Sequence, residues 1–301
     1  MRVSVITPFY YGNDYIREYE KMMSANEEAL SDDDELEVLI VNDSPEEPVR
    51  LRGMYLCRQN WRIITNEANK GIHASRLRGL SEATGEYVIF LDQDDTLVPD
   101  AIASFLEQAK AEVTGAKHLC YRLLVANAAL EQEDGAFLPW YRTKWHKKQI
   151  DRLSVYTAIG TQIISPGQCM MAKCIIPKEW KDNVLAANGA DDYYLWLLLL
   201  MRGIGVTYID RVLYKHRYTS RNLSTDTAIT DASTMQFVGY LEHTDFPRRQ
   251  LALLKRQTVY KADFRRSGAA LKMLLSLQNL DLFLANVWFK IKTRTGYGFN
   301  R

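Results

Sequence analysis

Short apolar runs alternate with helical stretches through the first hundred residues of the chain. Strands are expected at 3–7, 37–41, 62–65 and 87–91, with helices at 14–30 and 73–83 between them. Most residues of these runs are apolar, which is typical of strands buried on both faces of a parallel sheet. Repetition of strand and helix therefore predicts an α/β fold with a mostly parallel central sheet flanked by helices.

The rest of the chain continues this pattern less regularly. We expect helices at 99–113 and 190–201, and strands at 118–126, 206–209 and 212–214. The stretch 131–167 shows no clear period and is expected to be a variable loop region. From residue 231 onward the pattern becomes helical and basic. These changes predict a domain over 1–230 and a basic helical C-terminal extension over 231–301.

The charge of the chain is balanced overall but uneven along its length. Lys and Arg number 38 against 37 Asp and Glu, so the chain lacks the excess positive charge typical of nucleic-acid-binding proteins. Residues 231–301, however, hold twelve Lys/Arg and five Asp/Glu, a net of +7. Because apolar residues such as Leu271 and Trp288 accompany these charges, the extension is expected either to bind an anionic membrane surface or to pack its apolar face on the body.

The cysteines and the apolar runs bear on where the protein works. The four cysteines form no C-x-x-C pair, which argues against a zinc site and a disulfide framework (Cys57, Cys120, Cys169, Cys174). The N-terminus enters a strand pattern directly, without the features of a leader segment. No uncharged apolar run of 18 residues is present, as a spanning helix would need. We expect a cytoplasmic protein, peripheral on the inner face of a membrane if the extension binds lipid.

Polar residues follow the predicted strands at the point where each strand ends. They are Thr7-Pro8, Asn42-Asp43, Asn69-Lys70-Gly71 and Asp92-Gln93-Asp94-Asp95. Ligands of open α/β sheets bind at this edge. Neither a dinucleotide-binding glycine motif nor a P-loop is present, so those two classes of nucleotide site lose their main support.

The acidic strand end at 92–95 brings three carboxylates into four residues. Carboxylates this close repel one another unless a cation lies among them. Mg²⁺ or Mn²⁺, shared with phosphate oxygens, is the natural partner. The alternative is that Asp94 or Asp95 caps the following helix while Asp92 faces solvent.

These segments together resemble the family 2 glycosyltransferases of the GT-A fold. The resemblance rests on the strand and its end at 3–10, on 41–44, on Asn69-Lys70-Gly71 with Arg76, on 92–95, and on Asp191-Asp192-Tyr193-Tyr194-Leu195-Trp196. It spans roughly residues 1–220. It implies a Rossmann-like sheet and an inverting transfer of a sugar from a nucleotide diphosphate, expected to be a UDP-sugar, to an acceptor hydroxyl.

The resemblance also assigns roles by position. It places three residues in the base pocket (Thr7, Pro8, Tyr10) and puts Asp43 on the uracil-like base. It places others around the nucleotide (Lys70, Gly71, Arg76, Asp92, Gln93), and makes Asp94 the direct metal ligand with Asp92 beside it. Asp192 aligns with the family's general base, and Asp191 is the fallback. Without the resemblance, both acids could simply favour a helix N-terminus.

Several positions depart from the family's pattern. Leu77 and Asn13 replace polar or acidic residues that relatives often have. The histidine that often approaches the metal is displaced, because Thr219 stands at its usual place and His216 lies three residues earlier. His216 is therefore either a metal ligand or a solvated or core histidine.

The stretch between 132 and 168 is expected to border the acceptor. Trp140, Tyr141 and Trp145 could stack on sugar rings or belong to the core. Gln168 could reach the donor or the acceptor sugar.

The expected function is a metal-dependent inverting glycosyltransferase of surface polysaccharide synthesis, with a saccharide or lipid-linked saccharide acceptor. One alternative is a sugar-1-phosphate nucleotidyltransferase, although Thr7–Tyr10 stands where such enzymes carry a glycine-rich basic loop. The other is a catalytically silent relative that binds nucleotide-sugar or glycan.

Overall fold

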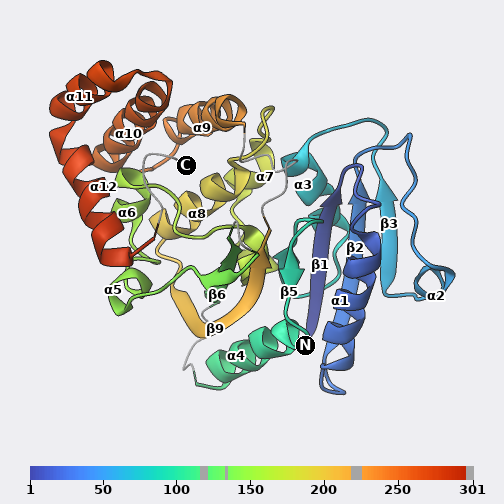
Figure 1. Cartoon of the computed structure of the whole chain (residues 1–301). Helices are drawn as coiled ribbons and strands as arrows, with labels where there is room; N and C mark the ends of the chain where they lie inside the picture. Colours follow the sequence, from blue (N-terminus) through green and yellow to red (C-terminus); the bar gives the residue numbers. More distant parts are fainter. Residues whose placement is uncertain (116–120, 133–134, 218–225, 296–301) are drawn as a thin grey trace. The chain divides into compact units, whose positions relative to one another are not determined.

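The computed structural model describes residues 1–115, 121–132, 135–217 and 226–295 (Figure 1). The chain divides into two compact units. The first unit comprises Met1–Pro139, Ile163–Ile176 and Ile204–Thr219; the second comprises Trp140–Gln162, Pro177–Gly203 and Ser220–Arg301. These bounds differ from the expected division at residue 230, which remains a prediction about where the catalytic domain ends.

The first unit is built on one sheet whose strands, among the described residues, follow the order β3-β2-β1-β4-β8-β6-β9-β5, with β7 beside β6. Strands β1 to β4 run parallel to one another, as predicted, whereas β8 is antiparallel to both β4 and β6. The strands are β1 Arg2–Phe9, β2 Glu35–Asn42, β3 Trp61–Thr65, β4 Tyr87–Phe90, β5 Thr96–Leu97, β6 Leu123–Glu131, β7 Phe137–Pro139, β8 Cys169–Ala172 and β9 Val206–His216.

Helices cover both faces of the parallel half of this sheet. Successive residues of a strand point to opposite faces. On β1, a Cβ added at Gly79 of α3 would lie 2.3 Å from the side chain of Ile6, whereas the next residue, Thr7, shares a hydrogen bond of 2.9 Å with the hydroxyl of Tyr19 on α1. Helices α1 and α3 therefore pack on opposite faces. The unit's helices are α1 Ile16–Glu28, α2 Gly53–Leu56, α3 Ile72–Glu82 and α4 Ala101–Gly115, with 3₁₀ turns η1 Pro166–Gln168 and η2 Lys173–Ile175.

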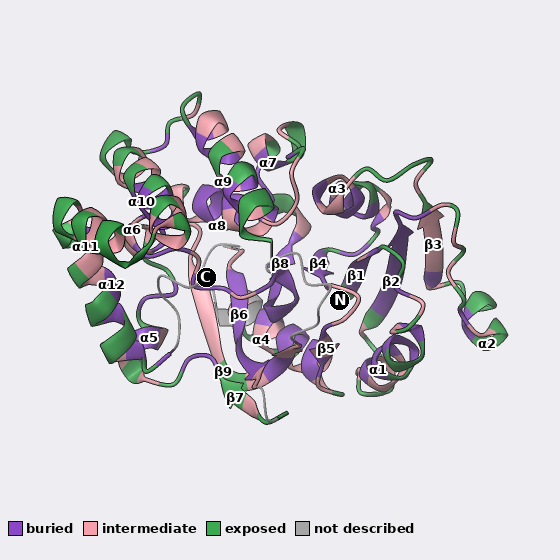
Figure 2. Ribbon diagram, turned by 45° about the horizontal axis from the view of Figure 1, so that its top comes forward, coloured by how far each residue is buried: buried purple, intermediate pink, exposed green. Residues whose placement is uncertain are grey.

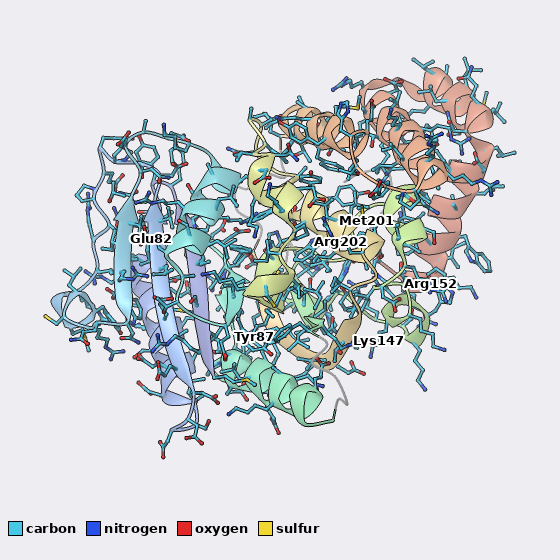
Figure 3. All side chains as sticks on the ribbon, turned by 180° about the vertical axis from the view of Figure 1, so that it is seen from behind. Glu82, Tyr87, Lys147, Arg152, Met201 and Arg202 are labelled. Atoms are coloured by element: carbon cyan, nitrogen blue, oxygen red, sulfur yellow. The ribbon has the colours of Figure 1, made fainter. Side chains whose placement is uncertain are left out.

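The described part of the second unit is helical. Its helices are α5 Lys144–Lys147, α6 Leu153–Ala158, α7 Lys178–Asp182, α8 Asp191–Met201, α9 Thr227–Leu241, α10 Arg248–Arg266, α11 Ala269–Gln278 and α12 Leu280–Thr293. Helix α8 buries Leu195 through Leu199 without a break, and Arg202 follows its end (Figure 3). Helix α10 is tied to its surroundings by buried polar contacts, because Lys261 donates to the carbonyl of Ile159 and Arg265 pairs with Asp231 of α9.

Two expectations for the middle of the chain differ from the structure. The strand expected at 118–126 is observed as β6 over Leu123–Glu131, and residues 116–120 lie outside the described part. The stretch expected to be a loop at 131–167 holds β7, α5, α6 and the start of η1. Helices α5 and α6 have four and six residues, which is too short for a 3.6-residue period to be recognised.

Candidate active site

The carboxyl ends of β1, β2, β3 and β4 meet at one edge of the first unit's sheet, as their parallel register requires. Phe9 pairs with Asn42, Asn42 with Thr65, and Ile6 with Phe90. The segments that follow these strands are therefore neighbours, although Tyr10 after β1 and Gln93 after β4 are 83 positions apart in the chain. This edge is where the sequence predicted the site (Figure 1).

At the end of β1, Gln93 holds the backbone of Tyr10. Its side-chain oxygen accepts from the Tyr10 N–H at 2.8 Å, and its side-chain nitrogen donates to the Tyr10 carbonyl at 3.0 Å. A Cβ at Gly12 would lie 2.3 Å from that oxygen of Gln93 and 2.8 Å from the ring of Phe9, so a larger residue there would force these side chains to shift. The Tyr10 side chain remains 48% exposed. Gln93 thus positions the loop that presents Tyr10.

Of the residues expected to line a base pocket, Thr7 has no exposed surface. Its side chain is fully buried and its hydroxyl is hydrogen-bonded to Tyr19. Pro8 is half-buried and Tyr10 is exposed. A ligand contact through the Thr7 side chain is therefore incompatible with this packing. Pro8 of β1 and Tyr10, which follows the strand, are left as the candidates.

Asp43, at the end of β2, fastens the loop that precedes α3. One carboxylate oxygen accepts from the side chain of Asn66 and from the N–H of Lys70, each at 2.8 Å, and the other accepts from the N–H of Gly71 at 2.8 Å. Gly71 has φ +87°, a conformation that favours glycine, and it precedes the first turn of α3. Asp43 therefore fixes the backbone of Lys70, whose side chain is exposed.

The acidic segment after β4 is partly neutralised by Arg76. This buried guanidinium on α3 donates to Asp92 at 2.6 Å. The other oxygen of Asp92 accepts from the Ser165 hydroxyl at 3.3 Å. Arg76 and Asp92, both predicted site residues, are thus brought together as an ion pair, and Ser165 is a partner that the sequence reasoning missed.

Asp95 joins the acidic segment to β9. One of its oxygens lies 2.9 Å from Nδ1 of His216, and the other accepts from the Tyr214 hydroxyl. Burial lowers the pKa of His216, but the charges of Asp95, Asp92 and Asp94 outweigh burial and leave that pKa raised. His216 therefore lies beside the acids as a partner of Asp95, and a metal contact would have to come from its Nε2 atom.

Asp94 lies in an environment that disfavours its charged form. Its pKa is raised to about 6, first by burial and then by the negative charges of Asp95 and Asp92. Within the described ranges, no three Asp, Glu, His or Cys side chains are grouped so that they could hold a metal ion by themselves. A cation at Asp94 would need further ligands from water or from a phosphate group.

The two acids of the second unit differ in exposure. Asp191 is 2% exposed and its backbone carbonyl accepts from the indole of Trp180 at 2.8 Å. Asp192, the next residue in the first turn of α8, is half-buried. Of the pair, Asp192 offers more carboxylate surface to a ligand.

Two of the three aromatic residues between 132 and 168 that could stack on sugar belong to the core of the second unit. Trp140 and Tyr141 are each 2% exposed, and both donate to the carbonyl of Gln162. Trp145 is half-buried with its ring 5.6 Å from that of Phe289. Gln168, in the first unit, is also fully buried, and its side chain donates to the Ala126 carbonyl at 2.8 Å. The core alternative is therefore correct for Trp140 and Tyr141, and the buried side chain of Gln168 offers no exposed surface to a sugar.

Three comparisons bear on the family of this chain. Residues 4–173 match the family described as Glycosyl transferase family 2. The chain is 22% identical over 206 residues to the cholesterol galactosyltransferase of Borreliella burgdorferi, across 66% of this chain and 56% of that protein. It is 24% identical over 228 residues to TuaG of Bacillus subtilis, named as a teichuronic acid biosynthesis glycosyltransferase, across 74% of this chain and 82% of that protein. The chain thus spans little more than half of the galactosyltransferase.

Solved structures show the same fold. The S. aureus TarS fragment 1–349 in complex with UDP-GlcNAc superposes with a TM-score of 0.60 at 15% identity, over 95% of this chain and 79% of that one. The same fragment in complex with UDP gives 0.58 at 16% identity, over 90% and 75%. The sheet and the superposition on TarS agree with a GT-A-type fold. Because the family match covers more than half of the 301 residues, the chain belongs to glycosyl transferase family 2.

Proposed function

We propose that this protein is an inverting, metal-dependent glycosyltransferase that moves a sugar from a UDP-sugar to a hydroxyl of a saccharide or lipid-linked saccharide in surface polysaccharide synthesis. The observation that carries the proposal is the half-buried Asp94 between two further carboxylates at the ligand-binding edge of the sheet. The proposal draws support from the TarS fragment, which was solved with UDP-GlcNAc and with UDP.

The residues at this edge fit a divalent ion that is shared with the substrate. Mg²⁺ is usually held in proteins by one or two carboxylates together with phosphates and water, and rarely by a complete protein cage. Asp94 would supply the protein ligand, with Asp92 beside it and held by Arg76. Mn²⁺ or Mg²⁺ bound there would neutralise charge that develops on the leaving diphosphate.

The nucleotide would be bound by the segments that follow β1 to β3. In this proposal, Tyr10 and Pro8 contact the base, and the loop fixed by Asp43 brings the ammonium of Lys70 to the phosphates. The N–H groups of Lys70 and Gly71 already donate to Asp43, so we assign Asp43 the task of shaping this loop in addition to its expected contact with the base. Arg76 acts by positioning Asp92.

Asp192 is the proposed general base, which accepts the proton of the acceptor hydroxyl as that oxygen attacks the sugar. Its greater exposure favours it over Asp191, whose burial leaves little surface for an acceptor. Asp192 lies in the first turn of α8, where the helix dipole favours a negative charge.

The test is a transfer assay on Asp192→Asn. UDP release from a panel of UDP-sugars with Mn²⁺ and saccharide acceptors should fall about a hundredfold or more, because a general base contributes at least that factor. Donor binding, followed by thermal shift, should be unchanged. The control is Asp182→Asn, whose exposed side chain lies on α7 of the same unit.

Substantial transfer by Asp192→Asn would remove the base from this position. Donor binding by the wild-type chain with no transfer to any acceptor would instead favour a silent nucleotide-sugar-binding relative.

A further inference from the structure

The last two helices carry half of the large apolar side chains that the described chain exposes. Nine of these eighteen side chains lie on or next to α11 and α12: Leu271, Met273, Leu274, Leu277, Leu280, Leu284, Val287, Trp288 and Ile291. None of the residues of α11 is buried, and Figure 2 shows the exposed colour along both helices. Contiguous exposed apolar surface of this kind marks an interaction site in a folded protein.

Helix α12 has two distinct faces. One face is buried in the second unit through Leu282, Asn286, Phe289 and Thr293, and it is fastened to α5 where the hydroxyl of Thr143 donates to the Lys292 carbonyl at 2.9 Å. The opposite face carries the 280–291 stripe, which we define as Leu280, Leu284, Val287, Trp288 and Ile291. These positions recur every three or four residues, and each is at least 37% exposed. The side chains of the stripe therefore lie outside the packed core of the unit.

Cations border this stripe on both sides. At about 100° per residue, Lys290 and Lys292 lie roughly 100° to either side of the middle of the stripe. The ammonium of Lys292 lies 4.5 Å from the ring centre of Trp288. Asp281, the acid of α12, is paired with Arg256 of α10, and Lys272 adds a further cation on α11. A lipid surface would meet an apolar stripe whose lysines reach anionic headgroups.

We propose that α11 and the 280–291 stripe dock this protein on an anionic lipid bilayer, with the stripe among the acyl chains and Lys290 and Lys292 at the headgroups. In the described ranges, no helix is both long and apolar enough to span a bilayer, and α12 has 14 residues. The helices therefore lie in the plane of the interface. This inference is independent of the proposed glycosyl transfer, since vesicle binding is measured without donor or acceptor.

The test is co-sedimentation of the full chain with vesicles of phosphatidylglycerol and phosphatidylcholine, compared with pure phosphatidylcholine. The wild-type chain is expected to bind the anionic vesicles more strongly. Trp288→Ser with Ile291→Ser should lower binding by a factor of about ten for each side chain withdrawn from the bilayer. Lys290→Gln and Lys292→Gln should each lower it about fivefold on anionic vesicles alone.

A matched control comes from the first unit. Met54 and Leu56 of α2 are each 58% exposed, close to the 55% of Trp288 and 63% of Ile291. Met54→Ser with Leu56→Ser should leave vesicle binding unchanged. Trp288 is also the one exposed indole among the six tryptophans of the chain, so brominated lipid should quench a part of the emission that Trp288→Phe removes.

Failure of the wild-type chain to bind anionic vesicles overturns the proposal, as does equal loss of binding in the Met54/Leu56 variant. The proposal would also be overturned if the chain does not bind vesicles but forms a dimer in sedimentation velocity, and if Ile291→Ser dissociates that dimer. The stripe would then bind a second copy of the chain. Urea unfolding of each variant verifies that the fold is intact.

Discussion

Replacing Asp43 by Asn tests whether one carboxylate shapes the loop before α3. The amide keeps the size of the side chain but exchanges an accepting oxygen for a donating NH₂ group. If the NH₂ group takes the place of the first oxygen, the Asn66 side chain and the Lys70 N–H both lose their acceptor. If the NH₂ group takes the place of the second oxygen, only the Gly71 N–H loses its Asp43 acceptor. That N–H keeps another acceptor, the side-chain oxygen of Asn69 at 3.0 Å.

The second orientation loses fewer hydrogen bonds, so the loss of stability is estimated from it. A hydrogen bond to a charged group contributes about 1.5–3 kcal/mol. The bonds from Asn66 and Lys70 remain, but they become weaker because their acceptor is no longer charged. We expect Asp43→Asn to lower the free energy of unfolding by about 2–3 kcal/mol. Asn69→Ala alone should cost less, because Gly71 still donates to Asp43. The double variant should cost more than the sum, since Gly71 then loses both acceptors.

The assay is urea unfolding of the four proteins, with amide hydrogen exchange at Lys70 and Gly71. Exchange at both amides should accelerate in Asp43→Asn, and UDP binding should weaken in parallel because the loop is no longer held. If stability, exchange and UDP binding all match the wild-type protein, Asp43 does not organise this loop.

Two further predictions concern packing and pH. Gly79→Ala should destabilise the protein by about 2 kcal/mol, because overpacking against Ile6 outweighs the gain in helix propensity. Gly239→Ala is the control, since an added Cβ there has no atom within 4 Å, and it should stabilise the protein by about 0.5–1 kcal/mol. Equal effects of the two variants in thermal unfolding would refute the close approach of α3 to β1. Burial lowers the pKa of His146 to about 4, so the unfolded chain binds a proton between pH 6.5 and 4 that the folded chain does not. Stability should therefore fall by about 2 kcal/mol between pH 7 and 5 on account of His146, and urea unfolding of His146→Gln should lack this loss; an identical pH profile would contradict it.

The first half of the fold was predictable because its signals are local. Strands β1, β2 and β4 are mostly apolar and buried, and polar residues at or after their ends mark the edge of the sheet. The family resemblance assigned both Asp92 and Arg76 to the nucleotide site, but it did not predict that the two form an ion pair. Ser165 carries a weaker local signal, since it precedes Pro166 and Gly167 and caps the 3₁₀ turn η1.

Other parts depend on contacts between residues far apart in the chain. Asp95 meets His216 across 121 positions, and Tyr214 reaches it across 119. No local pattern shows that β9 returns beside the acidic segment. Trp140 and Tyr141 lie in a segment without a clear period, so sugar stacking and core packing both stayed open for them, and both side chains are buried in the second unit. Their indole and hydroxyl groups donate to the carbonyl of Gln162, 22 and 21 positions later in the chain.

The central claim is that Asp94 anchors a divalent ion and the diphosphate of the donor. Calorimetric titration with UDP, in the presence of Mn²⁺ or of EDTA, tests it on the wild-type chain, on Asp94→Ala and on Asp263→Ala, an exposed acid of α10. We predict UDP binding that requires Mn²⁺ in the wild-type and Asp263→Ala proteins and is lost in Asp94→Ala. Absence of UDP binding by the wild-type chain, or equal affinity in EDTA, would contradict the claim.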